Sequence, residues 1–107
     1  MFTRNVSLCL KADSLAKFVS AFENDVLPAL RRQTGFRGEI LLGAEGTTDV
    51  NAISLWDTKE QADAYEIAIY PGIRQDLDRF FESPPKVRVM SVISSTLKGF
   101  AVRTTVV

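Results

Sequence analysis

The chain has 107 residues, which is enough for one domain with its own hydrophobic core. Its thirteen acidic and thirteen basic residues balance, so no overall field favours nucleic acid or an anionic membrane as a partner. The absence of histidine excludes a serine–histidine triad and removes the commonest metal ligand and general base.

The N-terminal part of the chain has the pattern of a strand followed by a helix. Residues 2–11 alternate between apolar and polar side chains, the period of two that is typical of a strand. Asp13 or Ser14 can cap the helix that follows, because a short side-chain oxygen accepts from unpaired N–H groups. Apolar residues then recur at helical spacing and predict one buried stripe, formed by Leu15, Phe18, Val19, Phe22, Val26 and Leu30.

Pro28 falls inside this helix. It has no N–H to donate, and its ring clashes with the preceding turn, so we predict a kink near Asn24 or Asp25. Gly35 suits the end of the helix, because glycine adopts the left-handed conformation common there.

Two strands at residues 36–42 and 49–56 are joined by a short segment with Gly43 and Gly46, which predicts a β-hairpin. Alternation in the second of these strands separates Asn51, Ile53 and Leu55 from the face made by Val50, Ala52, Ser54 and Trp56.

A second helix begins at a capping box formed by Thr58 and Gln61. Pro71 predicts a break and a new helical start near Tyr70, because proline disfavours helical geometry in the residue before it. Residues 86–95 have the alternation of a last strand.

The element order is therefore strand, helix, strand, strand, helix, strand. This order predicts an α+β, ferredoxin-like βαββαβ fold, an antiparallel sheet with two helices on one face. We assign residues 1–95 to this domain. Residues 96–107 form a C-terminal extension that we expect to pack on the domain or on a dimer partner.

The other sheet face has no helix to cover it. We predict that Trp56, Val50 and Ala52 lie on this uncovered face. An apolar sheet face normally marks an interaction surface. Two copies that pack these faces together would form a homodimer with a cavity, a dimeric α+β barrel.

Four stretches carry a resemblance to a known family: residues 26–30, 35–38, 53–62 and 84–87. They resemble the helix end, the entry to the second strand, the strand-to-helix segment and the start of the last strand in antibiotic-biosynthesis-monooxygenase-like domains. These domains are part of the dimeric α+β barrel superfamily. The resemblance implies the same fold and a small-molecule pocket.

The family includes cofactor-independent oxygenases of aromatic phenols and haem-degrading oxygenases. Asn5 and Trp56 are similar in position to an asparagine and a tryptophan of the haem-degrading branch. That branch also uses a histidine on its second helix, where this chain reads Ile73-Arg74-Gln75. The resemblance therefore implies chemistry without haem, and we expect neither a cofactor nor a metal.

The leading hypothesis is a cofactor-independent monooxygenase that binds a small hydrophobic or aromatic, phenolic ligand. Asn5 and Trp56 are the candidate catalytic residues, and Ser7, Ser54 and Tyr70 are the candidate ligand-binding residues. The alternative is a non-catalytic ligand-binding or assembly module, because the sequence has no recognisable acid–base pair.

Each of these residues also has a purely structural interpretation. Trp56 can pack at a sheet end or dimer interface, and the polar strand residues can bond to backbone or water. For Arg4 and Arg37 we expect surface salt bridges, in preference to contacts with an anionic ligand. Cys9 is the only cysteine, so it has no internal disulfide partner; together with the missing leader or spanning segment, this favours the cytoplasm.

Overall fold

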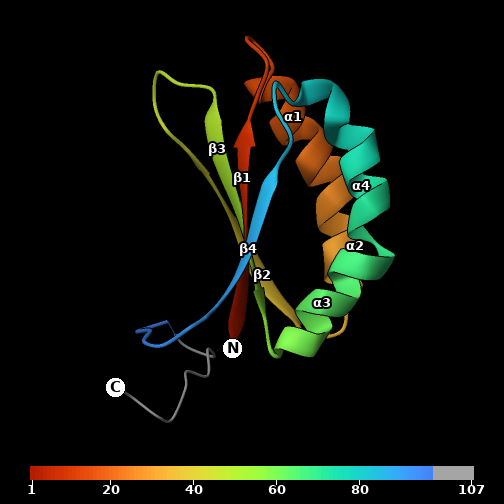
Figure 1. Cartoon of the computed structure of the whole chain (residues 1–107), viewed down its shortest axis with the longest axis vertical. Helices are drawn as coiled ribbons and strands as arrows, with labels where there is room; N and C mark the ends of the chain where they lie inside the picture. The colour runs from red at the N-terminus through yellow and green to blue at the C-terminus, as the bar shows by residue number, and fades with distance from the viewer. Residues whose placement is uncertain (98–107) are drawn as a thin grey trace.

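The computed structural model describes residues 1–97 and contains the predicted order of strands and helices (Figure 1). The four strands are β1 (Phe2–Cys9), β2 (Phe36–Gly43), β3 (Asp49–Trp56) and β4 (Lys86–Ser91). The helical segments are α1 (Leu15–Ala21), η1 (Phe22–Val26), α2 (Leu27–Arg31), α3 (Lys59–Ala68), α4 (Tyr70–Leu77) and η2 (Asp78–Phe80).

The strands form one antiparallel sheet in the order β2-β3-β1-β4. All helical segments lie on one side of this sheet, as Figure 1 shows. The predicted α+β, ferredoxin-like fold is confirmed. The first and last strands are shorter than predicted: β1 ends at Cys9, and β4 ends at Ser91 instead of residue 95.

Pro28 changes the helix that precedes it. The segments α1, η1 and α2 follow one another without a break, and η1 is a π-helix whose last turn has the Leu27 N–H bonded to the Phe22 carbonyl. Pro28 cannot donate to the Asn24 carbonyl, and its ring crowds that group. The helix therefore forms a hydrogen bond there that spans five residues in place of four. Where a kink was predicted, near Asn24 and Asp25, the structure has a π-turn, and the kink itself stays a prediction.

The start of α1 differs from the expected cap. Ser14 holds the N-cap position, but its side chain makes no capping hydrogen bond. Its hydroxyl instead donates to the Ala12 carbonyl at 3.5 Å. Asp13 adopts a positive φ of 59°, a conformation that aspartate tolerates better than most residues.

The second helical segment begins and breaks as predicted. The Gln61 N–H donates to Thr58 Oγ1 at 3.2 Å, and the Thr58 N–H donates to Gln61 Oε1 at 3.2 Å, which is the expected capping box. The break between α3 and α4 lies at Ile69, with Pro71 in the first turn of the new helix. This break puts Tyr70 at the start of α4.

The hydrophobic core fills the space between the sheet and the helices. Phe18 is fully buried, and its ring lies 6.1 Å from Phe22, 6.1 Å from Phe80 and 6.2 Å from Phe81 between centroids. These rings join α1, η1 and the segment after α4. The aromatic cluster therefore ties the two helical halves to one core.

The predicted orientation of β3 is wrong. Trp56 is fully buried, and Val50 belongs to the core, with Ala52 packed against it. Phe2 pairs with Trp56, so the Trp56 face of β3 is continuous with the β1 face that carries Arg4 and Val6, which the helices cover. Alternation separates two sets of residues but does not say which set meets the helices.

The face away from the helices is nevertheless partly apolar. Among the described residues it carries Ile53 and Leu55 from β3, and the more exposed Ile40 (44%), Leu42 (49%) and Met90 (42%). We call this set the open face. Residues 98–107, most of the predicted C-terminal extension, lie outside the described residues, so the packing of that extension stays a prediction.

The aromatic cluster generates a stability prediction. Phe18→Ala removes a fully buried ring and is expected to lower the free energy of unfolding by about 3–5 kcal/mol. Leu15→Ala, in the same helix but 52% exposed, is the matched control and should change it by about 0.5 kcal/mol or less. Urea denaturation measures both, and similar losses for the two variants would contradict this account of the core.

Candidate functional site

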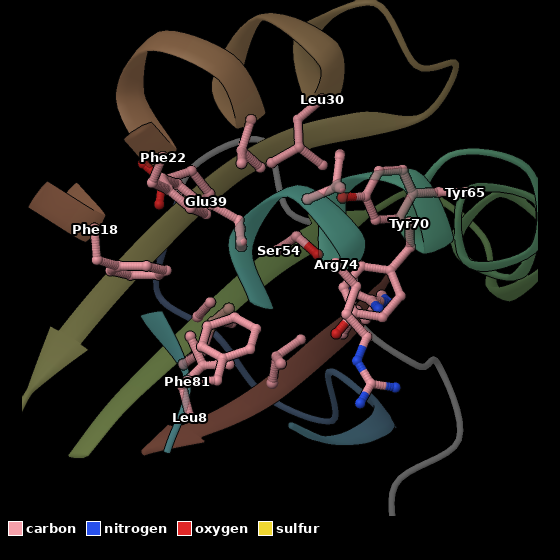
Figure 2. A pocket seen from close by; sticks show the side chains of 17 residues that line it. Leu8, Phe18, Phe22, Leu30, Glu39, Ser54, Tyr65, Tyr70, Arg74 and Phe81 are labelled. Atoms are coloured by element: carbon pink, nitrogen blue, oxygen red, sulfur yellow. The ribbon is translucent and has the colours of Figure 1, made fainter. Parts of the chain in front are cut away.

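A pocket lies between the helix-covered sheet face and the helices (Figure 2). Its wall combines residues from β1, β2, β3, both helical halves and the segment after α4. Most of this wall is apolar, and its polar or charged members are Arg4, Glu39, Ser54, Tyr65, Tyr70 and Arg74. Ligand pockets commonly have this combination of an apolar wall and a few polar groups.

The enclosed space is small. Its volume is about 50 Å³, enough for a few water molecules. Ligand pockets usually measure about 300–1,000 Å³, so a multi-ring ligand needs the wall to move outward.

Arg4 is the charged group most firmly built into this wall. It projects from β1 toward the helices with 3% of its surface exposed. Its Nε donates to Glu66 Oε2 of α3 at 2.9 Å, and its Nη2 bonds to the same oxygen. The guanidinium lies 3.9 Å from the centroid of the Tyr70 ring and 5.2 Å from that of Tyr65, within cation–π range.

Arg4 was therefore misjudged from sequence, whereas Arg37 was not. Arg37 is exposed and pairs with Asp57 at 2.6 Å, which is a surface salt bridge. The signal for Arg4 was present in the alternation of β1, because Arg4 shares the face of Val6 and Leu8. A charged residue in register with a buried apolar face indicates a buried and paired charge.

Two tyrosine rings lie near the Arg4 guanidinium, and Figure 2 shows both rings on the same side of the pocket. Burial raises the pKa of Tyr65 to about 12, and the nearby Arg4 charge opposes this only in part. Burial also raises the pKa of Tyr70 against the same opposing charge. Both phenols are therefore protonated at neutral pH and can donate hydrogen bonds.

Trp56 does not line the pocket itself but bonds to Ser54, which does. Its Nε1–H donates to Ser54 Oγ at 2.8 Å in the buried interior. Ser54 lines the pocket, and the Trp56 ring lies behind it, 5.3 Å from Tyr65 and 5.7 Å from Phe36. Trp56 thus holds Ser54 in place, and its indole N–H is already used.

Glu39 contributes a carboxyl group to the same wall. It pairs with Ser54 across β2 and β3, and in Figure 2 it lies on the Phe22 side of the pocket. Burial raises its pKa, the Glu23 charge raises it further, and Arg31 lowers it. Glu39 was not predicted as a site residue, because Ile40, Leu41 and Leu42 follow it and mask the alternation of β2.

Asn5 and Ser7 are not part of this pocket. Asn5 pairs with Ile53 and Arg88, which places it on the open face, and its Nδ2 donates to Thr3 Oγ1 at 2.8 Å. Ser7 is exposed on the same face. The expectation that Asn5 and Trp56 meet in one pocket is wrong, because the two residues point to opposite sides of the sheet. Ser54 and Tyr70 do line the pocket under the helices, and their role in binding a ligand stays a prediction.

Among residues 1–97, no three His, Cys, Asp or Glu side chains come together as a metal site. None of the helices described is long and apolar enough to cross a membrane.

Comparison with known proteins relates the chain to others by structure only. No family profile matches it. No curated protein matches its sequence either.

Solved structures do match it over most of its length. One is the ActVA-Orf6 monooxygenase of Streptomyces coelicolor with nanaomycin D bound, with 18% identity, 92% of each chain covered and a TM-score of 0.77. Another is SnoaB, a cofactor-independent oxygenase of Streptomyces nogalater, with 15% identity, coverage of 89% and 95%, and a TM-score of 0.74. A third is a Nitrosomonas europaea protein of unknown function, with 16% identity, coverage of 92% and 95%, and a TM-score of 0.70. The chain therefore has the fold of antibiotic-biosynthesis-monooxygenase-like domains, as its sequence predicted.

The raised pKa of Glu39 predicts a pH dependence of stability. The folded protein holds this proton to higher pH than the unfolded chain, so stability falls as pH rises from the unfolded pKa through the folded one. Glu39→Gln removes this titration. We expect the variant to gain stability relative to the wild type as pH rises from acid to neutral, measured by urea denaturation. A difference that does not vary with pH would contradict the raised pKa.

Proposed function

We propose that the protein is a cofactor-independent monooxygenase that acts on an aromatic, phenolic small molecule held between the sheet and the helices. The observation that carries this proposal is the apolar pocket with Arg4, Ser54, Tyr65 and Tyr70 around it. Structural neighbours with oxygenase activity support it, one of them with nanaomycin D bound.

The reaction needs no external reductant. A substrate CH₂ group flanked by phenolic rings reacts with O₂ to give a carbonyl and water: one oxygen atom enters the product, the other leaves in water, and the substrate supplies all the electrons. The substrate must lose a proton before its carbon can react with O₂. A positive charge near the resulting anion favours that loss.

Arg4 is the group that we assign to stabilise this anion. Its charge is buried, and a buried charge acts more strongly than an exposed one because water does not screen it. Glu66 pairs with Arg4 and competes with a bound anion for its charge. The Glu66 side chain is 41% exposed, so water screens the carboxylate more than it screens the buried guanidinium. Tyr70 can add a hydrogen bond, and Trp56 has a positioning role through Ser54. Binding of a multi-ring ligand requires the pocket wall to move outward.

A turnover experiment tests this assignment. With a hydroxyanthrone as substrate, we expect consumption of one O₂ per anthraquinone formed, in the absence of flavin, haem, metal and reductant. Arg4→Met should lower kcat/KM by about a hundredfold, in the range found when an oxyanion-stabilising group is removed. Arg37→Met, which removes an exposed arginine with a similar ion pair, is the matched control and should keep full activity.

Two outcomes would contradict the proposal in different ways. Binding of the anthrone without enzymatic O₂ consumption indicates the alternative, a non-catalytic ligand-binding module. No binding of the anthrone at all removes the aromatic pocket from the account.

We also propose that the protein is a homodimer in which two open faces pack together. Support comes from the apolar side chains of that face, including Ile40, Leu42 and Met90, which are left accessible to water in the single chain. The cytoplasm is the proposed location, supported by the single unpaired cysteine, Cys9.

A charge on the open face tests the dimer. Leu42→Lys should convert a micromolar dimer into a monomer, because the lysine ammonium would have to be buried without a partner. Ile67→Lys introduces the same charge on α3 at a residue that is 78% exposed, and it should leave the dimer intact. Sedimentation velocity measures both, and a wild-type protein that sediments as a monomer at micromolar concentration would overturn the proposed dimer.

A further inference from the structure

Glu39 differs from the other charged groups of the pocket because one of its carboxyl oxygens is buried and makes no hydrogen bond within residues 1–97. Oε2 of Glu39 has no hydrogen-bond partner within residues 1–97, and it is the only buried side-chain oxygen or nitrogen of that range in this state. A buried polar atom that makes no hydrogen bond destabilises the folded state, because it has lost its hydrogen bonds to water. Such an atom in a pocket wall therefore indicates a place where a ligand or a water donates.

The surroundings of this carboxyl group do not satisfy it. Phe22, Val26 and Leu30 line the pocket with it, and none of these side chains can donate. The Arg31 charge lowers the pKa of Glu39 from a distance and the Glu23 charge raises it; within residues 1–97, Glu39 forms no salt bridge. Ser54 pairs with Glu39 across the strands and accepts from Trp56, and among residues 1–97 it makes no hydrogen bond to Glu39 Oε2.

Hydrogen-bond donors and the acceptor Glu39 therefore lie in different parts of the pocket. Arg4, Tyr65 and Tyr70 lie together and can donate hydrogen bonds, whereas Glu39, on the Phe22 side in Figure 2, can accept them. A flat aromatic ligand that fits this arrangement carries a hydroxyl group at one end and a carbonyl or oxyanion at the other. Hydroxyl-bearing anthrones and quinones belong to this chemical class.

We propose that Glu39 is a ligand-binding residue that accepts a hydrogen bond from an aromatic hydroxyl group, and so selects phenolic ligands over hydrocarbons of the same shape. The proposal rests on the proposed function, because it assigns a residue of the same pocket. It adds a specificity determinant and an orientation: the free hydroxyl lies toward η1, and the reacting anion lies toward Arg4.

Phenol and toluene form a matched pair of probes, because they differ only in the hydroxyl that toluene replaces with a methyl group. Both are small single rings, and both can be titrated at millimolar concentration while backbone amide shifts are followed by NMR. The measured quantity is the ratio of the toluene Kd to the phenol Kd. We expect this ratio to be about tenfold larger in the wild type than in Glu39→Leu, because the wild type forms one more hydrogen bond to phenol. The comparison between proteins cancels the difference in hydrophobicity between the two probes.

Two further variants keep the test sharp. Glu39→Gln preserves the shape and an acceptor oxygen but not the charge, so it should retain part of the preference for phenol, since neutral acceptors form weaker hydrogen bonds. Glu45→Gln removes a charge from the exposed turn before β3 and should bind both probes as the wild type does. The NMR spectra also report whether each variant is folded; if Glu39→Leu is not, the comparison of wild type with Glu39→Gln decides.

The outcomes separate this proposal from the one on which it rests. Equal phenol-to-toluene ratios in wild type, Glu39→Gln and Glu39→Leu overturn the role of Glu39 and leave an aromatic-binding pocket. Binding of neither probe to the wild type overturns both proposals. A preference for phenol that falls in both Glu39 variants, and not in Glu45→Gln, supports the role of Glu39.

Discussion

The pairing of β1 with both of its neighbours is the constraint on which the rest of the structure depends. β1 lies in the interior of the sheet, between β3 and β4, and its register decides which side chains of those strands share a face. Because side chains alternate along a strand, a shift by one residue would move every buried side chain to the other face. The register that places Val6 and Leu8 under the helices also brings Arg4, Ser54 and Trp56 there, and it leaves Asn5 on the other side.

This constraint explains what could be predicted from the sequence and what could not. The order of elements, the capping box at Thr58, the disturbance before Pro28 and the break before Pro71 follow from local chemistry, and all are present. The choice of buried face in β3 depends on its pairing with β1, which is remote in sequence. Trp56 was therefore placed in the correct strand but on the wrong face, and its expected partnership with Asn5 failed with it.

Arg4 and Glu39, two of the charged residues in the pocket wall, differ in how the fold compensates their charge. Arg4 is compensated by Glu66 and by two aromatic rings, so its burial is consistent with a stable, fixed position. Glu39 has no comparable partner among residues 1–97, and its raised pKa expresses the same lack of compensation. A polar group whose burial has no compensating partner is a better guide to function than one whose partners stabilise it fully.

Fold similarity limits how far function can be transferred to this chain. Neighbours with almost the same agreement in structure include a cofactor-independent oxygenase and a protein of unknown function. At 15–18% identity for the two Streptomyces oxygenases, the likeness shows the fold alone. The chemistry of this chain must therefore be inferred from its own side chains. In this pocket they are an arginine that can stabilise an anion, two protonated tyrosines, and a carboxyl oxygen without a hydrogen-bond partner among residues 1–97, a set that suits a phenolic substrate better than it suits a hydrocarbon or a metal.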